Sequence, residues 1–221
     1  MKHRRARRPR RTWRKRAGEL ALVAVVVLVA AMAVRTFLVA PFSIPSGSME
    51  QTLQVGDRIL VDRLSYRLHD VRRGDVVVFD GTDSFGPVPR GGVSRDPLGA
   101  IAHAAGSAVG LARPAETDYV KRVIAVGGDR VTCCDREGRI TVNGSPVDER
   151  RYLHPGDDPS ELRFDVVVPE GRLWVMGDHR SDSLDSRAHL GDPGGGTVPV
   201  DDVIGRVMAV VWPIPRLGGL P

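Results

Sequence analysis

A long apolar segment close to the start of the chain limits how the rest can fold. Fifteen consecutive apolar residues run from Leu20 to Val34, and the apolar character resumes after Arg35-Thr36 and continues through Ala40. A helix over this whole stretch would be about 31 Å long, which matches the ~30 Å hydrocarbon core of a bilayer. We therefore expect residues 17–40 to form one transmembrane helix.

The charge of the chain is divided unevenly around this segment. Residues 1–16 carry ten Lys or Arg and no acidic residue, whereas the chain from Thr36 onward has 21 basic and 26 acidic residues. Positive charge before a transmembrane helix keeps that end in the cytoplasm. The pattern predicts a basic cytoplasmic tail over residues 1–16 and a domain over residues 41–221 outside the plasma membrane. A nucleic-acid-binding arm is an alternative for such a tail, but the apolar segment accounts for the charge, so no nucleic-acid partner is expected.

A secretory signal peptide is the other interpretation of the same segment. It would have a basic start, an apolar centre and a small-residue cleavage site, for which Ala31-Met32-Ala33 is suitable. The return of apolar residues after Arg35 favours a retained anchor.

Beyond this segment, short β-branched stretches alternate with turn residues. Such stretches predict strands. They are Arg58–Val61, Asp75–Phe79, Tyr119–Val126, Arg139–Val142, Asp165–Val168, Arg172–Met176 and Val203–Val211. The pair Asn143-Gly144 after one of them is typical of a hairpin with a primed turn. We expect a mainly β fold, with an antiparallel sheet or barrel-like body.

Two features interrupt the strand pattern. Residues 81–114 are rich in Gly, Pro and Ala and are expected to form a flexible insertion, within which Leu98–Leu111 could form a short helix. Cys133 and Cys134 are adjacent, so they lack both loop-closing and metal-ligand spacing. We interpret them as side chains on opposite faces of a strand, with a bridge between the neighbours as the alternative.

Ser48 is the candidate nucleophile. It lies in the sequence Pro45-Ser46-Gly47-Ser48, a few residues beyond the apolar segment. Such a loop is ordinarily only a turn. Gly47 leaves the backbone free to present the Ser48 N–H to a developing oxyanion, and the Ser46 hydroxyl could be a second donor. A serine needs a base, however, before it can attack a carbonyl.

Lys121 is the candidate base. The chain contains 29 arginines but only three lysines, Lys2, Lys15 and Lys121, and the first two belong to the basic tail. Arginine cannot release its proton, whereas a buried lysine can. Lys121 lies inside an apolar predicted strand, where burial would lower the pKa of its amine. We therefore expect it to act as a neutral base.

A polar cluster follows the predicted strand Arg172–Met176. It runs Gly177-Asp178-His179-Arg180-Ser181-Asp182-Ser183-Leu184-Asp185-Ser186-Arg187. Its hydroxyl groups could orient an amine, and Asp185 with Arg187 could brace the loop. His179 also permits a Ser–His–Asp arrangement, whereas His69, His103, His154 and His189 lie in loops without metal-ligand spacing.

Together these residues resemble the bacterial type I signal peptidases, which remove signal peptides from exported proteins. The resemblance covers nearly the whole chain, with five motifs in the family's order. They are Ile44-Pro45-Ser46-Gly47-Ser48-Met49, Gly56-Asp57-Arg58-Ile59-Leu60-Val61, Gly74-Asp75-Val76-Val77-Val78-Phe79, Tyr119-Val120-Lys121-Arg122-Val123-Ile124-Ala125, and Gly177-Asp178 with Asp185-Ser186-Arg187. The resemblance implies a β-rich body with an extended apolar surface near the membrane.

The resemblance also implies roles for individual residues. Ser48 matches the nucleophile, Lys121 the general base and Ser46 a position of the oxyanion hole. The supporting residues are Ser183, which matches the serine that holds the lysine amine, the pair Asp185 and Arg187, and Asp178. The chain departs from the family at Gln51, where proline is usual, and at His179, where asparagine is common.

The expected function is that of a membrane-bound serine endopeptidase. Its partners would be the signal peptides of preproteins, cleaved after small residues of the Ala-x-Ala type, and the lipid bilayer. No metal or cofactor is expected. Two alternatives remain: a serine hydrolase with His179 as its base, and a non-enzymatic anchored β-module whose tail binds lipid or nucleic acid.

Overall fold

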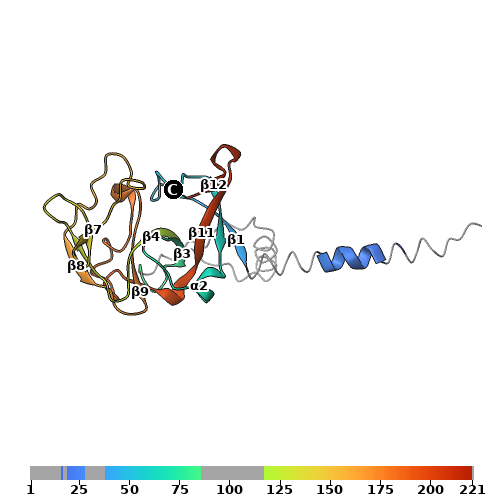
Figure 1. Cartoon of the computed structure of the whole chain (residues 1–221), viewed down its shortest axis with the longest axis horizontal. Helices are drawn as coiled ribbons and strands as arrows, with labels where there is room; N and C mark the ends of the chain where they lie inside the picture. The colour runs from blue at the N-terminus through green and yellow to red at the C-terminus, as the bar shows by residue number, and fades with distance from the viewer. Residues whose placement is uncertain (1–15, 17–18, 28–37, 86–116, 221) are drawn as a thin grey trace, which may run out of the picture.

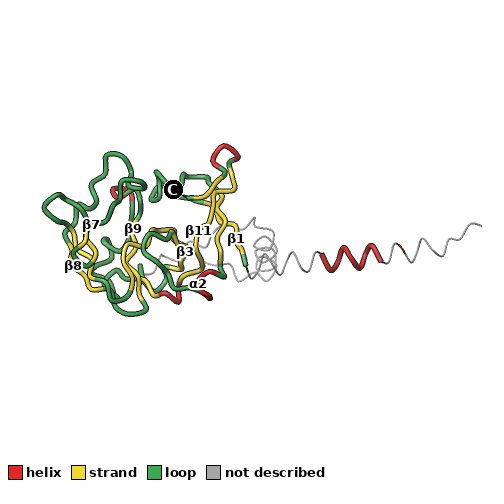
Figure 2. Tube along the Cα trace, viewed as in Figure 1, coloured by secondary structure: helices red, strands yellow, loops and turns green. Residues whose placement is uncertain are grey.

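The computed structural model describes residues 16, 19–27, 38–85 and 117–220. Within them the chain forms two antiparallel sheets joined by loops and short helical turns, as Figure 2 shows. The strands β7 and β8 lie at one side of the body and β1 at the opposite side (Figure 1). The prediction of a mainly antiparallel β fold is confirmed.

The larger sheet has eight strands in the order β1-β2-β11-β3-β4-β9-β10, with β12 paired to β11. The strands are β1 (Val39–Ser43), β2 (Arg58–Asp62), β3 (Val76–Asp80), β4 (Asp118–Val126), β9 (Arg172–Met176), β10 (Val198–Pro199), β11 (Val203–Trp212) and β12 (Gly218–Gly219). Helical turns are α2 (Ser65–Leu68), η1 (Arg180–Asp182), η2 (Val200–Asp202) and η3 (Ile214–Arg216). This order places β11, from near the end of the sequence, between β2 and β3, which both come early in it.

The smaller sheet has four strands in the order β7-β6-β5-β8. They are β5 (Arg130–Cys133), β6 (Thr141–Val142), β7 (Ser145–Pro146) and β8 (Phe164–Val167). Asn143 and Gly144 both have positive φ, 52° and 78°, as the central residues of a type I′ turn require. The predicted hairpin is therefore confirmed, with its strands shorter than expected.

Apolar residues of the strands and their connections fill three hydrophobic clusters. One lies between the two sheets and includes Ile140, Phe164 and Trp174. The other two pack on the larger sheet, one around Met49, Leu53 and Ile59 and one around Phe79 and Val123. Since β-branched side chains pack well on a pleated surface, the Val-rich stretches form these strands.

The N-terminal region differs from expectation at its boundary. Residues 19–27 are helical, while residues 17–18 and 28–37 of the expected transmembrane helix lie outside the described residues. Val39 and Ala40 belong to β1, where they pair with Asp62 and Val61, so the expectation of a helix through Ala40 is wrong for these two residues. Pairing with β2 satisfies the backbone there as a helix would have done. No helix of the described residues has the length and apolarity needed to cross a bilayer.

The two interrupting features have different outcomes. Residues 86–114 of the expected insertion, with the possible helix Leu98–Leu111, lie outside the described residues. Cys133 and Cys134 form a disulfide with each other, so the interpretation as side chains on opposite faces of a strand is wrong and the alternative, a bridge between the neighbours, is confirmed. Cys133 is the last residue of β5 and Cys134 lies beyond it, so strand alternation does not separate the two side chains.

An ion pair ties the end of the fold to its beginning. The guanidinium of Arg216, at the end of η3, donates to both carboxylate oxygens of Asp57 and to the Thr52 carbonyl. Asp57 in turn accepts a hydrogen bond from the Gln54 N–H. These contacts brace the turn that joins β1 to β2.

Candidate active site

Ser48 lies in the connection between β1 and β2. The buried side chains of Met49 and Leu53 are one helical turn apart and anchor this connection in the core. The Leu53 N–H donates to the Met49 carbonyl at 2.7 Å, which closes the turn. Ser48 is only 8% exposed, so its hydroxyl is held in a nearly dry position next to the sheet.

Lys121 reaches the same position from β4. Its Nζ donates a hydrogen bond to Ser48 Oγ at 2.7 Å, and the residue is 3% exposed. Burial lowers the pKa of the Lys121 amine from 10.5 to about 8, against the opposing charges of Asp185, Asp178 and Asp182. The predicted burial is confirmed, and near neutral pH this amine loses its proton far more readily than an exposed lysine.

Ser46 lies on the exposed side of the pair. Its Oγ is 3.5 Å from Ser48 Oγ, at the limit of a hydrogen bond. Ser46 itself is exposed, whereas Ser48 is buried. The hydroxyl group is therefore close enough to contact a group that bonds to Ser48.

Asp178 is fully buried and lies in the loop just after β9. It accepts hydrogen bonds from Arg122 and from the Thr52 hydroxyl. The Arg122 guanidinium also lies 4.1 Å above the Tyr152 ring. Arg122 and Thr52 were not among the predicted site residues. A charged residue next to Lys121 inside an apolar strand was the signal that could have indicated Arg122.

Asp185 organises the remaining predicted residues. Its carboxylate accepts hydrogen bonds from the Gly177 N–H at 2.9 Å, from the Ser183 hydroxyl at 2.8 Å and from the Arg187 guanidinium. Burial raises the pKa of Asp185, but these hydrogen bonds outweigh it, so the pKa lies below its usual value. The Ser183 hydroxyl thus donates to Asp185, while the Lys121 amine donates to Ser48.

Gly177 lies between the Ser48 backbone and the Ser183 side chain. A Cβ atom at this position would collide with the Ser183 side chain and with the Ser48 carbonyl oxygen. Only glycine therefore lets the polar loop approach the Ser48 backbone this closely.

His179 is bound to the Ser48 backbone. Its N–H donates to the Ser48 carbonyl at 3.1 Å, and its ring stacks on His154 with centroids 3.9 Å apart. The ring Nδ1 has no hydrogen-bond partner among the described residues. The hydrogen bond from a basic side chain to Ser48 Oγ comes from Lys121, so this geometry does not favour the His179 alternative.

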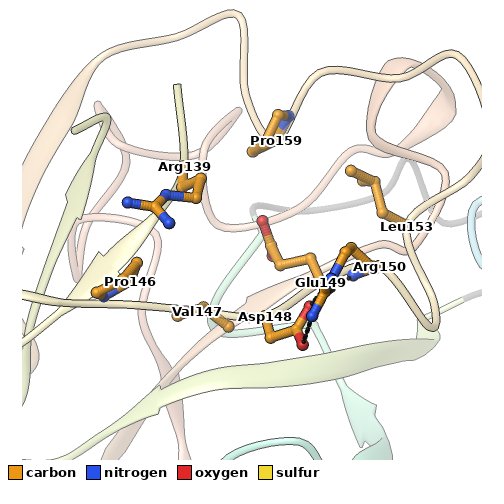
Figure 3. Close-up of a pocket in the computed structure, with 8 residues that line it drawn as sticks. All are labelled: Arg139, Pro146, Val147, Asp148, Glu149, Arg150, Leu153 and Pro159. Atoms are coloured by element: carbon orange, nitrogen blue, oxygen red, sulfur yellow. Dashed lines mark hydrogen bonds and ion pairs between the residues drawn. The ribbon is translucent and has the colours of Figure 1, made fainter. Parts of the chain in front are cut away.

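A pocket of about 470 Å³ lies beside β7, and Figure 3 shows the residues that line it. Arg139, Leu153 and Pro159 line it, together with an ion pair between Arg150 and Asp148. None of the predicted site residues is among those that line this pocket.

Comparison with known proteins identifies the family. Residues 17–212 match the model of the family described as signal peptidase, peptidase S26. The chain belongs to this signal peptidase family. Membership makes it a serine peptidase, a hydrolase, so the expected enzyme class is confirmed and the alternative of a non-enzymatic module is set aside.

Individual relatives agree with the family match. A signal peptidase I of Mycobacterium tuberculosis (strain CDC 1551 / Oshkosh) is 44% identical, over 95% of this chain and 77% of its own length. A probable signal peptidase I of Mycobacterium leprae (strain TN) is 42% identical, over 91% of this chain and 78% of its own. A crystal structure of a signal peptidase I from Enterococcus faecalis V583 is similar over 62% of this chain and 97% of that chain, with 19% identity and a TM-score of 0.38.

Proposed function

We propose that this chain is a membrane-bound endopeptidase that removes N-terminal signal peptides from exported preproteins, with Ser48 as nucleophile and Lys121 as general base. The observation that carries the proposal is the 2.7 Å hydrogen bond from Lys121 Nζ to Ser48 Oγ within a buried site. A hydroxyl next to an amine of lowered pKa is the arrangement that activates a serine without histidine.

In the first step, neutral Lys121 accepts the Ser48 proton while Oγ bonds to the scissile carbonyl carbon. The negative charge on the carbonyl oxygen is stabilised by the Ser48 N–H and the Ser46 hydroxyl. The Lys121 ammonium then protonates the departing amine, the peptide bond breaks, and an ester to Ser48 remains. The closeness of Ser46 Oγ to Ser48 Oγ, 3.5 Å, supports the assignment of Ser46.

In the second step, Lys121 is neutral again and accepts a proton from water, whose oxygen attacks the ester. The tetrahedral intermediate collapses, Ser48 regains its proton, and the cleaved signal peptide leaves with a new carboxylate. Asp178 and Asp185, each fully buried and bound to an arginine, hold the loop beside the pair in place.

The substrate class follows from the relatives and from the resemblance. The curated relatives are named signal peptidase I, and the resemblance implies small residues, typically alanine, one and three positions before the cut. We propose that the preprotein binds as an extended segment along an exposed strand edge.

We propose that the apolar segment from Leu20, ending before β1, anchors the enzyme in the plasma membrane. Its nineteen residues through Leu38 remain within the length that spans a bilayer. The basic tail of residues 1–16 would lie in the cytoplasm, with the domain from residue 41 outside. Sharing one bilayer with its substrates would raise their effective concentration.

The proposal is tested with the purified full chain in detergent and a preprotein that carries an Ala-x-Ala site. Ser48→Ala and Lys121→Ala should each lower the cleavage rate by at least about 100-fold. Lys121→Arg should also be inactive, because arginine keeps its proton. Lys15→Ala, which changes a tail lysine, should cleave at the unchanged rate. Wild-type cleavage by Lys121→Ala would overturn the proposal.

A second measurement separates the nucleophile from the base. A serine-directed acylating inhibitor should label Ser48 in the wild-type protein, and labelling should be much slower in Lys121→Ala. Labelling of another serine, or an equal rate in both proteins, would contradict the assignment.

A further inference from the structure

Three residues with metal-ligating side chains meet beside the Ser48 backbone. They are Glu50, His154 and His179, and one ligand atom from each lies within 4.8 Å of the others. Glu50 follows the nucleophile by two residues, His154 lies in the loop after β7, and His179 lies in the loop after β9. None of them takes part in the proposed peptide-bond chemistry.

The two imidazole rings have unused nitrogen atoms. Nδ1 of His154 and Nδ1 of His179 are both buried, and neither has a hydrogen-bond partner among the described residues. Buried polar atoms are normally paired, so two neighbouring exceptions require an explanation. The Glu50 carboxylate lies 3.8 Å from Nδ1 of His179, too far for a hydrogen bond but on the same side. Two imidazoles and a carboxylate whose ligand atoms lie within 4.8 Å of one another are suited to a shared cation.

The backbone holds all three residues in fixed relative positions. The His179 N–H donates to the Ser48 carbonyl at 3.1 Å, the His154 N–H to the Asp178 carbonyl at 2.9 Å, and the Glu50 N–H to the Gly47 carbonyl at 2.8 Å. The three backbones are thus tied to the segments around Ser48, and coordination of one ion would involve movement of the side chains. Because the rings now stack with an angle of 19° between their planes, they must tilt apart to point at one ion.

The surrounding charges favour a cation. Arg180 is paired with Glu149, and Arg122 is paired with Asp178, so these neighbouring guanidinium groups are already compensated. The Asp157 carboxylate interacts electrostatically with both histidines. An added cation would therefore enter a region with surplus negative charge.

We propose that Glu50, His154 and His179 form a binding site for one divalent transition-metal ion of the Zn²⁺ class. Two imidazole nitrogens and one carboxylate oxygen are a donor set that zinc accepts, with a fourth position left for water. Mg²⁺ and Ca²⁺ prefer oxygen donors and should bind poorly. The ligand atoms, which now lie within 4.8 Å of one another, must come to about 3.4 Å, the separation expected for tetrahedral ligands about 2.1 Å from zinc.

The test is a Zn²⁺ titration of the purified full chain against a chromophoric zinc chelator. Wild-type protein should bind one Zn²⁺ at this site. His154→Gln, His179→Asn and Glu50→Gln should each weaken binding by about tenfold or more, since loss of even an outer-shell partner has an effect of this size. His69→Gln is the matched control, because His69 is an exposed histidine away from the three ligands, and it should bind as the wild type does.

Co²⁺ gives a second readout that does not depend on peptide cleavage. Bound at this site it should show the intense visible absorption of a four-coordinate ion, and the His154→Gln/His179→Asn double variant should lose that absorption. Circular dichroism establishes that each variant is folded. The proposal is overturned if the wild type binds no stoichiometric Zn²⁺, or if the folded double variant binds it equally well. Either result leaves the assignment of Ser48 and Lys121 unaffected, because cleavage is measured separately.

Discussion

The guanidinium group of Arg122 binds both carboxylate oxygens of Asp178, with Nε 2.8 Å from Oδ1 and Nη2 2.7 Å from Oδ2. Arg122 directly follows Lys121 on β4, and Asp178 directly precedes His179, whose N–H is bound to the Ser48 carbonyl. This ion pair therefore connects the strand of the candidate base to the segment of the candidate nucleophile.

Loss of this ion pair should destabilise the fold. Asp178→Asn should lower the free energy of unfolding by about 3–5 kcal/mol, because it leaves the Arg122 guanidinium buried without its counter-charge. Urea denaturation followed by tryptophan fluorescence measures the change. Asp148→Asn is the control, since Asp148 is paired with Arg150 on the surface, and its unfolding midpoint should be unchanged. Equal effects of the two substitutions would contradict this account.

The cleavage rate should depend on the protonation of Lys121. Because burial lowers the pKa of this amine to about 8, kcat/KM should rise about tenfold per pH unit below that value and level off above it. The exposed Asp182 carboxylate raises the pKa of Lys121, so Asp182→Asn should move the profile to lower pH. A profile centred near 6.5 and abolished by His179→Ala would instead indicate a histidine base.

Lys121→Met should be inactive but more stable than the wild type at neutral pH. The pKa of Lys121 falls from 10.5 to about 8 on folding, so the unfolded chain binds its proton more tightly. The resulting destabilisation is complete below pH 8, decreases as the pH rises and vanishes above pH 10.5. Denaturation at pH 7 should show a gain of roughly 3 kcal/mol for the variant. The gain should disappear in a second experiment near pH 10.5, and its persistence there would assign it to packing instead.

Gln51 occupies a backbone conformation that proline cannot adopt. Its φ is +87°, whereas the proline ring fixes φ near −65°. Gln51→Pro should therefore lower the unfolding free energy by more than about 1 kcal/mol, although proline is usual here in the family that the sequence resembles. Gln51→Gly relieves the unfavourable φ and should be at least as stable as the wild type. Thermal unfolding of both variants and the wild type measures these differences. A proline variant more stable than the wild type would contradict this account of Gln51.

Much of the fold could be predicted because local patterns and tertiary packing agree. The stretch from Tyr119 to Val126 is rich in β-branched residues and lies within β4, and Asn143-Gly144 forms the turn that its residues favour. The strand β1 was missed because Val39 and Ala40 are as apolar as the helix expected before them. Their pairing with β2, some twenty residues later, decides their conformation.

The contact between Ser48 and Lys121 was anticipated for a different reason. A single lysine in a domain otherwise built with arginine indicated a need for an amine that releases its proton. No such asymmetry distinguishes Glu50, His154 and His179, which are separated along the chain by up to 129 positions and meet only through the tertiary fold. Spacing rules detect ligands that share one turn or one hairpin, and they do not detect this arrangement.

The contacts of Arg216 also bear on the order in which parts of the chain fold. Arg216 lies 159 positions after Asp57 and braces the turn that carries Ser48, and β11 pairs with both β2 and β3. Contacts between segments so distant in sequence form late, because a long loop must close first. A growing chain that already carries both Ser48 and Lys121 would still lack this support until residue 216 emerges. The segment that carries Ser48 therefore gains its full set of bracing contacts only after β11 and η3 have taken their places.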